Sequence, residues 1–565
     1  MSDRRGKLRT IVPRGIAFGV LSGLALPVAI GAVAVDSGGQ VERQFRKPPE
    51  SRSAKPRPPT LPQRTRRPAP AGEGVDVSGF QLEGGTVYRQ DDLQPMFAPY
   101  LGRKVTPEEL LALAEALTDR YHRDGYLLSD VEVPEQSVTD GVVRLVATEG
   151  YVAEVRIQGS GDIPLTVFEP FIEPIRTERP ATANVLERNL FLMNDLGGVG
   201  LASALEPIAG QAGAHVLVIN VARDRLAGAV AVDNRGSRST GPWRGYFDLY
   251  AVGLTGHFDE TAFRAVTTGD RELTFLYLSH DEPIGSSGAR VGVSVNASDS
   301  HVTDLGANIN LETRSRGLAV SASYPLYRTQ RANVYVRGTY TAHNGVTDVP
   351  GFPVTRDRVR ALRLAMTFDS LDSLGGVNLL EVELSRGLRG MGASANDDPT
   401  RSRENGRNDF FKTTVYAARL QSIAEHWSIL AALNAQYASN NLLVPEQFAF
   451  GGDQFGRGYN AAELVGDSGV ALKLELRLSG GKPESLPGPY TVYGFYDLGK
   501  AWTRSPIEAL GEVSLYSASS AGLGVRMNVG SNFGAFVEVA QPLTRDVAER
   551  NNRRPRVFGG LSYRF

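Results

Sequence analysis

From residue 226 to the end of the chain, apolar and polar residues alternate with the period of a β-strand. The segments 362–368 and 472–478 show this clearly, because every second residue is apolar and the residues between them include arginine, lysine and glutamate. The runs are long enough for tilted strands to cross a bilayer, which takes about 9–11 residues, whereas strands of soluble domains usually have about 5–6 residues. We therefore expect a membrane β-barrel with an apolar outer face and a charged, wet lumen, rather than a soluble all-β domain.

Sixteen segments carry this alternation, and bacterial outer-membrane barrels have even strand numbers. In chain order they are residues 226–234, 244–252, 260–268, 272–279, 289–297, 317–327, 331–342, 358–369, 377–386, 412–421, 427–438, 470–479, 490–499, 519–529, 533–541 and 556–565. The last segment ends on the aromatic Phe565, which we expect to be the C-terminal assembly signal that such barrels carry. The predicted barrel occupies residues 225–565.

Residues 75–224 mix helical periods with short strands. Thr106, Pro107 and Glu109 indicate a helix start, with Thr106 as N-cap and Glu109 placed to complete a capping box. The apolar residues that follow recur at helical spacing. The order strand, helix, helix, strand, strand occupies residues 75–150, and the same order begins again at residue 151 and closes with a strand at 215–221. We therefore expect two small α+β modules, at 75–150 and 151–224.

The first 34 residues have a basic start, an apolar run over residues 16–34 and small residues at its end. This pattern is typical of a secretory signal peptide at 1–34, and an N-terminal membrane anchor is the alternative. Residues 35–74 are rich in proline and arginine and poor in apolar residues, so we expect a linker that does not fold alone. Residues 40–46 are either part of that linker or a short helix that plugs a pore.

Composition and motif spacing restrict the chemistry. The net charge of −1 gives no bias toward nucleic acid, and without cysteine there is no disulfide, thiol nucleophile or cysteine-ligated metal. The seven histidines form no pair with metal-ligand spacing, and no serine lies in a Gly-x-Ser-x-Gly elbow. We interpret His280 beside Asp281 as part of a loop. The sequence therefore predicts no catalytic residues, no metal and no cofactor.

The most unusual segment is residues 448–459, between the eleventh and twelfth predicted strands. It is too aromatic to remain in water, and Gly451, Gly452 and Gly458 allow tight turns. We therefore expect this loop to fold back into the lumen of the barrel. A shielded Arg457 then requires a carboxylate partner.

The thirteenth predicted strand offers that carboxylate. Tyr493, Phe495 and Asp497 lie on one face of the strand, and this face is lumenal if Asp497 is to avoid lipid. We therefore predict an Arg457–Asp497 ion pair with bidentate geometry. We call it the loop–barrel pair.

Two motifs resemble those of the outer-membrane transporters of two-partner secretion, the hemolysin secretion/activation and filamentous-hemagglutinin exporter family. Arg457-Gly458-Tyr459 matches the motif of that family's sixth surface loop, although Gly456 replaces the usual valine. Phe495-Tyr496-Asp497-Leu498-Gly499 matches a barrel-strand motif whose aspartate pairs with the loop arginine in the family. The segment 133–150 resembles the closing hairpin of the family's first POTRA module.

The resemblance implies a plug helix before a proline-rich linker, two POTRA modules in the periplasm and a barrel in the outer membrane of a Gram-negative bacterium. It also implies that the chain captures an unfolded exoprotein and passes it outward without ATP. The implied partners are this secreted client, outer-membrane lipid and, during biogenesis, the barrel-assembly machinery, and we expect a monomer. The alternative function is an outer-membrane insertion or assembly factor of the same superfamily.

Overall fold

The computed structural model describes residues 41, 45, 60–61, 73–159, 165–269, 271–302, 311–348, 354–481, 488–507 and 512–565. The expected signal peptide and most of the linker lie outside the described residues. The chain divides into two compact units. One consists of residues 56–223 with 328–330, and the other contains the rest of the chain.

The first module packs helices against a small mixed sheet. Its elements are β1 (Val75–Val77), β2 (Gly79–Glu83), α2 (Gln90–Phe97), the 3-10 helix η1 (Ala98–Tyr100), β3 (Arg103–Val105), α3 (Pro107–Arg123), β4 (Asp130–Glu132) and β5 (Val142–Thr148). The sheet has the order β2-β5-β4, with β2 parallel to β5 and β4 antiparallel to it. Leu113 and Leu117 of α3 share a buried core with Leu145 of β5, so the predicted helical period does face the sheet.

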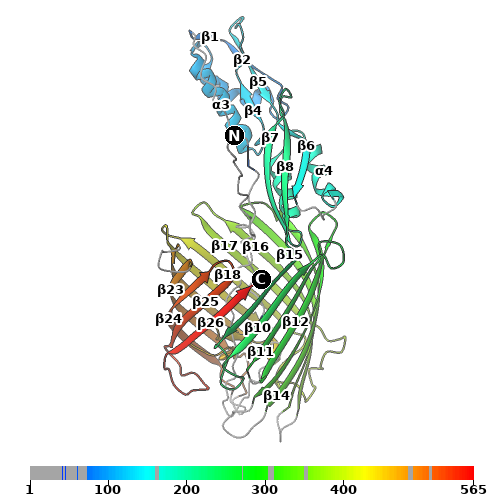
Figure 1. Cartoon of the computed structure of the whole chain (residues 1–565), viewed down its shortest axis with the longest axis vertical. Coiled ribbons are helices and arrows are strands. Elements are labelled where there is room, and N and C mark those ends of the chain that lie inside the picture. The colour runs from blue at the N-terminus through cyan, green and yellow to red at the C-terminus, as the bar shows by residue number, and fades with distance from the viewer. Residues whose placement is uncertain are drawn as a thin grey trace, which may run out of the picture. The chain divides into compact units, whose positions relative to one another are not determined.

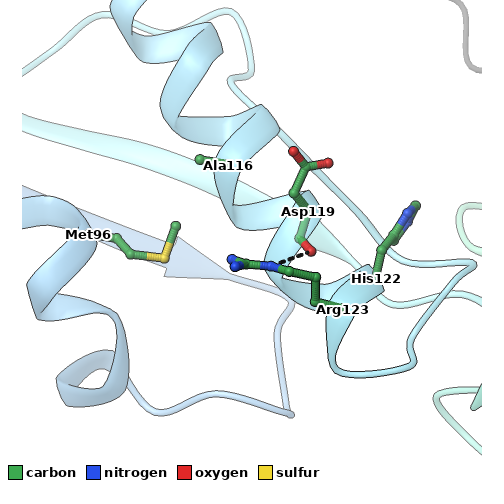
Figure 2. Close-up of a pocket in the computed structure, with 5 residues that line it drawn as sticks. All are labelled: Met96, Ala116, Asp119, His122 and Arg123. Atoms are coloured by element: carbon green, nitrogen blue, oxygen red, sulfur yellow. Dashed lines mark hydrogen bonds between the residues drawn. The ribbon is translucent and has the colours of Figure 1, made fainter. Parts of the chain in front are cut away.

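Helix α3 begins where the sequence predicts. The Glu109 backbone N–H donates to Thr106 Oγ1 at 3.3 Å, and the Thr106 N–H donates to Glu109 Oε2 at 2.9 Å, which completes the capping box. A surface groove of about 620 Å³ lies beside the C-terminal half of this helix (Figure 2). It is lined by Met96, Ala116, Asp119, His122 and Arg123.

The second module has the same plan. Its elements are β6 (Tyr151–Gly159), the 3-10 helix η2 (Leu165–Val167), α4 (Glu169–Thr177), α5 (Ala183–Asn194), β7 (Val199–Pro207) and β8 (Ala214–Arg223). The sheet order is β6-β8-β7, which places β7 at one edge. Strand β7 is absent from the sequence-based prediction, because its residues are mostly small and half-buried and show no clean alternation.

One described part of the linker pairs with this sheet. Thr60 forms a parallel bridge to Ala204 of β7. The Thr60 N–H donates to Ser203 O at 2.9 Å, and the Leu205 N–H donates to Thr60 O at 3.0 Å. The outer edge of β7 is therefore covered at this point by the chain itself.

The remaining described residues form a closed barrel of sixteen antiparallel strands, which confirms the predicted fold (Figure 1). The strands are β9 (Leu226–Asp233), β10 (Arg244–Val252), β11 (Glu260–Thr268), β12 (Leu273–Ile284), β13 (Ala289–Val302), β14 (Leu311–Arg328), β15 (Ala332–Asp348), β16 (Thr355–Leu371), β17 (Gly376–Gly387), β18 (Phe411–Ser422), β19 (Trp427–Ala438), β22 (Ser468–Gly480), β23 (Tyr490–Trp502), β24 (Leu515–Val529), β25 (Phe533–Pro542) and β26 (Arg556–Arg564). In Figure 1 the red β26 lies beside the green first strands, where β26 pairs with β9.

The outer and inner faces of the barrel strands differ in polarity as the alternating sequence predicts. In β16, Leu362, Leu364 and Met366 are about half exposed on the outer face. Between them, Arg363 points inward and reaches Glu446 with its Nη2 2.6 Å from Glu446 Oε1. The outer face is thus apolar enough for lipid, and the inner face carries paired charges.

Strands β14, β15 and β16 are longer than predicted, at 18, 17 and 17 residues. Most of their extra residues are polar or charged, as in Glu312–Arg316 of β14 and His343–Asn344 of β15. The two-residue hydrophobic period therefore ends before the hydrogen-bonded ladder does.

No helix among the described residues is long and apolar enough to cross a membrane.

Candidate functional site

The loop between β19 and β22 (residues 439–467) contains its own small hairpin. In it, β20 (Phe448–Phe450) pairs with β21 (Leu464–Gly466). The hairpin tip requires glycine, because Gly451, Gly452 and Gly456 have φ values of +123°, +87° and +97°. Side chains other than glycine rarely adopt these angles, so the glycine-rich sequence permits the tight tip.

The aromatic residues of the loop pack against small residues of the barrel wall. Phe448, Phe450 and Tyr459 are each at most 3% exposed. A Cβ on Gly469 of β22 would lie 2.0 Å from Phe448 Cδ1, and one on Gly499 of β23 would lie 2.2 Å from Phe450 Cδ2. These two wall glycines therefore leave the space into which the loop rings fit.

The structure brings Arg457 and Asp497 together inside the barrel. Arg457 Nη2 lies 2.8 Å from Asp497 Oδ1, and Arg457 Nε lies 3.0 Å from Asp497 Oδ2. The backbone N–H groups of Arg457 and Gly456 also donate to Asp497 Oδ2, at 2.9 and 3.2 Å. Since both side chains are almost fully buried, one carboxylate holds both the guanidinium and the backbone of the loop tip.

A second carboxylate, which the sequence-based prediction missed, also binds Arg457. Arg457 Nη1 lies 2.6 Å from Glu475 Oε2 of β22. Glu538 of β25 is slightly farther, at 3.8 Å from the same nitrogen. The guanidinium carbon stands 3.6 Å from the centroid of the Phe495 ring, a cation–π contact. Arg457 is thus held by wall residues from three strands.

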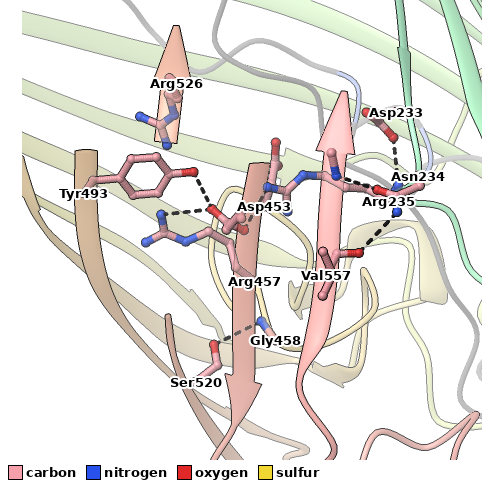
Figure 3. Close-up of polar contacts among 12 residues, drawn as sticks. Asp233, Asn234, Arg235, Asp453, Arg457, Gly458, Tyr493, Ser520, Arg526 and Val557 are labelled. Atoms are coloured by element: carbon pink, nitrogen blue, oxygen red, sulfur yellow. Dashed lines mark hydrogen bonds and ion pairs between the residues drawn. The ribbon is translucent and has the colours of Figure 1, made fainter. Parts of the chain in front are cut away.

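The carboxylates of Glu475 and Glu538 each also pair with at least one arginine other than Arg457. Arg477 Nε and Arg526 Nη1 lie 2.7 and 3.0 Å from Glu475 Oε1. Arg235 Nη2 lies 2.8 Å from Glu538 Oε1. Figure 3 shows Arg235 and Arg526 around Arg457. Each buried charge is therefore compensated, as a shielded ionic network requires.

The other motif residues of the loop also contact the wall. The Gly458 N–H donates to Ser520 Oγ at 3.2 Å (Figure 3), and a Cβ on Gly458 would lie 2.7 Å from Ser520 Cβ. Tyr459 donates its hydroxyl to Ser519 O at 3.1 Å and accepts the Arg545 N–H at 3.2 Å. The glycine is needed for close approach, and the tyrosine fixes the loop to β24 and to the connection after β25.

The start of the loop has its own ionic contacts. Glu446 Oε1 lies 2.6 Å from Arg363 Nη2 of β16, and Glu446 Oε2 lies 2.6 Å from Lys412 Nζ of β18. The sequence shows Arg363 as a lumenal charge, but nothing near Glu446 marks that acid as its partner.

The end of the loop is held by Arg403, in the connection between β17 and β18. Arg403 Nη1 donates to Asp467 Oδ1 at 2.6 Å and to Leu442 O at 2.7 Å. Its Nε donates to Glu512 Oε1 at 2.9 Å. Asp467 also accepts the Leu442 N–H at 2.7 Å. Three connections between strands therefore meet at one buried arginine.

Phe565 lies at the closure of the barrel. Its N–H donates to Gly228 O at 3.0 Å and its carbonyl accepts the Gly228 N–H at 2.9 Å. A Cβ on Gly228 would lie 2.3 Å from Phe565 Cζ, so the terminal ring covers this glycine of β9. The terminal aromatic residue continues the β26–β9 ladder.

Two residues of the predicted plug segment are described. Val41 and Phe45 are helical and buried, and they share an apolar cluster with the inward-facing Tyr246, Val266 and Phe275 of β10, β11 and β12. The Phe45 ring lies 5.3 Å from the Phe275 ring, between centroids.

A charged group also holds this segment. Arg264 Nη1 donates to Phe45 O at 2.6 Å. Asp248 orients the same guanidinium, with Oδ1 2.6 Å from Nε and Oδ2 2.8 Å from Nη2.

Within the described ranges, no group of three histidine, cysteine, aspartate or glutamate side chains is arranged to hold a metal ion. The charges at the centre of the barrel are arranged to fix a loop, because Asp497, Glu475 and Glu538 each contact an arginine. The arrangement holds residues 448–459 inside the barrel by buried ion pairs.

Comparison with known proteins agrees with this geometry. The family model for haemolysin secretion/activation protein ShlB/FhaC/HecB matches residues 213–527, and that for a ShlB-type POTRA domain matches residues 75–150. The chain is 22% identical over 467 residues to the heme/hemopexin transporter protein HuxB of Haemophilus influenzae (strain 86-028NP), with 81% of each chain covered. It is 24% identical over 450 residues to the outer membrane transporter CdiB of Escherichia coli, covering 77% of this chain and 74% of that one.

Solved structures show the same fold. CdiB from Escherichia coli superimposes with a TM-score of 0.70 at 20% identity, covering 89% of this chain and 93% of that one. CdiB from Acinetobacter baumannii gives a TM-score of 0.60 at 15% identity, with 94% and 96% covered. The chain therefore belongs to the haemolysin secretion/activation family ShlB/FhaC/HecB, the outer-membrane transporters of two-partner secretion, with a barrel in the outer membrane and POTRA modules in the periplasm.

Proposed function

We propose that this transporter captures one unfolded client protein with its periplasmic POTRA modules and passes it through the barrel without ATP. The observation that carries the proposal is the buried Arg457, which holds a folded-back loop inside a closed barrel by contacts to Asp497 and Glu475. Such a loop occupies the path of a translocating chain. The ion pairs give it a defined position from which it can move.

Capture has a physical basis in the edges of the POTRA sheets. An extended client segment can add a strand to an exposed edge, where main-chain hydrogen bonds supply affinity for many sequences. The edges are β2 and β4 in the first module and β6 and β7 in the second. Folding of the client outside the cell makes the passage irreversible, so that no nucleotide is required.

We propose that Arg457 and Asp497 hold the loop during transport, and that the segment around Val41 and Phe45 closes the pore at rest. The loop role is supported by four hydrogen bonds to one carboxylate. The plug role is supported by the apolar cluster with β10–β12 and by the Arg264 contact to Phe45 O. Planar-bilayer conductance with and without residues 35–72 tests the plug, and an unchanged conductance would contradict it.

The client is a secreted exoprotein. The related proteins HuxB and CdiB are named a heme/hemopexin transporter and an outer membrane transporter. We further propose that the transporter acts as a monomer and that Phe565 is recognised by the barrel-assembly machinery. The terminal ring supports the second point, because it is 51% exposed although it pairs with Gly228.

Secretion in a reconstituted host tests the function. The chain is produced in a Gram-negative host with the exoprotein encoded beside it, and the client is measured in the medium and in the periplasm. We expect the client in the medium only when the transporter is present. The control is the empty vector together with a second, unrelated barrel. Client retention in the periplasm, combined with improved membrane insertion of other barrels, would indicate an assembly factor instead.

A further inference from the structure

The lipid-facing side of the barrel carries a cluster of exposed arginines just beyond its apolar residues. The five members are Arg314 and Arg316 of β14, Arg356 and Arg358 of β16, and Arg386 of β17. Each continues the outward-facing apolar run of its strand in steps of two residues, as Arg316 does beside Leu318 and Arg386 beside Leu384. The cluster therefore adjoins the surface that contacts lipid.

The cluster lies at the outer end of the barrel. Strand β9 begins at Leu226, shortly after the second POTRA module ends with β8 at Arg223. The first strand therefore starts on the periplasmic side. Because successive strands are antiparallel, β14 and β16 begin at the opposite end and β17 ends there. The arginines lie close to these strand ends, so they face the outer leaflet of the membrane.

The strand register places two of the arginines on either side of an asparagine. Arg358 of β16 is opposite Asn344 of β15. Thr313 Oγ1 of β14 lies 3.3 Å from Thr347 Oγ1 of β15, and the short turn that joins these two strands gives the same register. In this antiparallel register Arg316 is opposite Asn344 from the other side. Since neighbouring strands are about 4.8 Å apart, Arg316 and Arg358 are about 10 Å apart across the sheet.

The exposed side chain of Asn344 is oriented by a buried arginine. Arg360 Nη2 donates to Asn344 Oδ1 at 2.9 Å. Arg360 is 8% exposed, and the carbonyl groups of His343 and Met391 accept its other N–H groups at 3.1 Å. The Asn344 carbonyl is therefore occupied, and its NH2 group can donate between the two guanidinium groups.

The cluster has an excess of positive charge. Arg314 pairs with Glu312 at 2.9 Å, and Asp299 of β13 is opposite Arg314 in the ladder. Among the described residues, by contrast, no carboxylate forms an ion pair with Arg316 or Arg358. Like charges on one face of a sheet repel each other. An anion bound between the arginines relieves this repulsion.

The arginines are a local feature of β14–β17 and do not form a ring around the barrel. On β11, β24 and β25 the equivalent outward-facing residues near the outer end are the uncharged Thr267, Ser517 and Gln541. Strand β23 has a single lysine there, Lys500. One sector of the barrel therefore attracts anions much more strongly than the others.

We propose that Arg316, Asn344 and Arg358 form a binding site for the phosphorylated headgroup of a lipid in the outer leaflet. A guanidinium group binds phosphate through two parallel N–H donors. The acyl chains of the lipid contact the apolar residues farther along the same strands, such as Leu318 and Leu362, which are 40% and 52% exposed. Basic donors beside apolar surface suit an anionic lipid better than a soluble anion.

Titration of the full-length protein in detergent with lipid A, a phosphorylated glycolipid, tests the site. Native mass spectrometry measures the bound lipid. Arg316→Gln with Arg358→Gln removes the two guanidinium groups. The matched control is Arg553→Gln with Arg554→Gln, which removes the same charge from exposed residues in the connection between β25 and β26. Heat-modifiable migration shows that each variant barrel is folded.

We expect the Arg316/Arg358 variant to bind lipid A about tenfold to thirtyfold more weakly than the wild type, because each basic residue near a membrane surface adds to the affinity for anionic lipid. The Arg553/Arg554 variant should stay within about twofold of the wild type. Lipid A without its phosphate groups should bind the wild type as weakly as lipid A binds the first variant. Inorganic phosphate at millimolar concentration should leave lipid A bound, because it makes no apolar contacts.

Four outcomes would overturn the inference. Equal lipid A affinities of the wild type and the Arg316/Arg358 variant would show that these residues bind no headgroup. An equal loss in the Arg553/Arg554 variant would indicate attraction to the overall charge alone. Equal binding of lipid A with and without phosphate would assign the contact to the apolar surface, and complete displacement by inorganic phosphate would assign the site to a soluble anion. Client secretion does not enter these measurements, so their result is independent of the proposed function.

Discussion

The guanidinium of Arg457 stacks on the ring of Phe495, with its central carbon 3.6 Å from the ring centroid. Asp497 lies two residues farther along β23 and binds the edge of the same guanidinium. One strand therefore supplies both the aromatic surface beneath the cation and the carboxylate at its edge. This explains in physical terms why the strand motif contains both residues at a spacing of two.

Asp497→Ala should leave the barrel in the membrane and strongly reduce client secretion. Loss of one partner of a buried ion pair typically costs about 3–5 kcal/mol, although Glu475 still compensates part of the Arg457 charge. The measurement is client in the medium, together with heat-modifiable migration of the barrel as the insertion control. Normal secretion by a correctly inserted variant would show that the loop–barrel pair has no role in transport.

Gly456→Val, which introduces the residue usual in the family, should impair this chain. Gly456 has a φ of +97°, and a Cβ there would lie 2.7 Å from Phe450 Cζ. We expect a loss of about 2 kcal/mol or more from backbone strain and overpacking together. Protease cleavage of the loop in intact cells reports its release from the lumen.

Gly530→Val is the matched control for that experiment. Gly530 also has a positive φ, of +62°, but a Cβ there would have no other atom within 4 Å. It therefore carries the backbone strain without the collision. If both variants resist protease as the wild type does, the loop tip does not depend on Gly456.

Phe450 and Gly499 should be energetically coupled. Gly499→Ala places a Cβ only 2.2 Å from Phe450 Cδ2, which is a steric clash. Phe450→Ala removes that ring, so Gly499→Ala should cost much less in the Phe450→Ala background. A double-mutant cycle on barrel unfolding should give a coupling of about 1–3 kcal/mol. Additive effects would mean that the ring does not occupy this space in the membrane.

The first POTRA module should lose stability in acid through Glu149. Burial acts to raise the pKa of the Glu149 carboxyl, but hydrogen bonds from Thr86, Val87 and Tyr121 outweigh it and hold that pKa below its usual range. A depressed folded pKa gives stability that is complete above the unfolded pKa of about 4.3 and is lost as pH falls through the folded value.

Glu149→Gln should therefore lower the stability of this module at neutral pH by about 1–2 kcal/mol and flatten its dependence on pH below about 4.3. Amide exchange of the segment 75–150 in the full-length protein measures both effects. Glu83→Gln is the control, because Glu83 lies 3.8 Å from Arg144 at the surface. An unchanged acid profile in Glu149→Gln would assign the acid sensitivity to other groups.

Arg403→Gln should open the outer end of the barrel. Arg403 contacts Leu442, Asp467 and Glu512. Burial acts to lower the pKa of Arg403, but the carboxylates of Asp467 and Glu512 outweigh burial and raise that pKa, so Arg403 stays charged. We expect more frequent openings in planar bilayers. Arg389→Gln is the control, because Arg389 pairs with Asp409 while 68% of its side chain is exposed, and exposed pairs contribute little. Identical channel records for the two variants would contradict a role for Arg403 in closing the barrel.

The strands of the barrel could be predicted from sequence because lipid and water impose opposite demands on successive residues. For the same reason Asp497 could be assigned to the lumen from the sequence alone. Helix α3 was predictable because Thr106 and Glu109 act locally. The sixteen predicted segments all correspond to strands, although their ends shift where both faces become polar.

The rest of the site depends on contacts across long stretches of chain. Glu475 and Glu538 look like any other inward-facing acids, and only the loop position reveals that both lie near Arg457. Gly456 shows the same limit, because its need for a positive φ follows from the hairpin around it. Strand β7 was missed since an edge strand with one half-buried face requires no regular apolar pattern.

The inner wall of the barrel has two chemically different sides. Around β22, β23 and β25 it is an ionic surface, where separation of Arg457 from its carboxylates leaves charges in a poorly solvated space. Around β10–β12 an apolar cluster and the ion-paired Arg264 contact the residues Val41 and Phe45. We expect a client chain that displaces Val41 and Phe45 to replace mainly dispersion contacts, because Arg264 stays paired with Asp248. Displacing Val41 and Phe45 therefore leaves no unpaired charge, whereas displacing the loop separates Arg457 from its carboxylates.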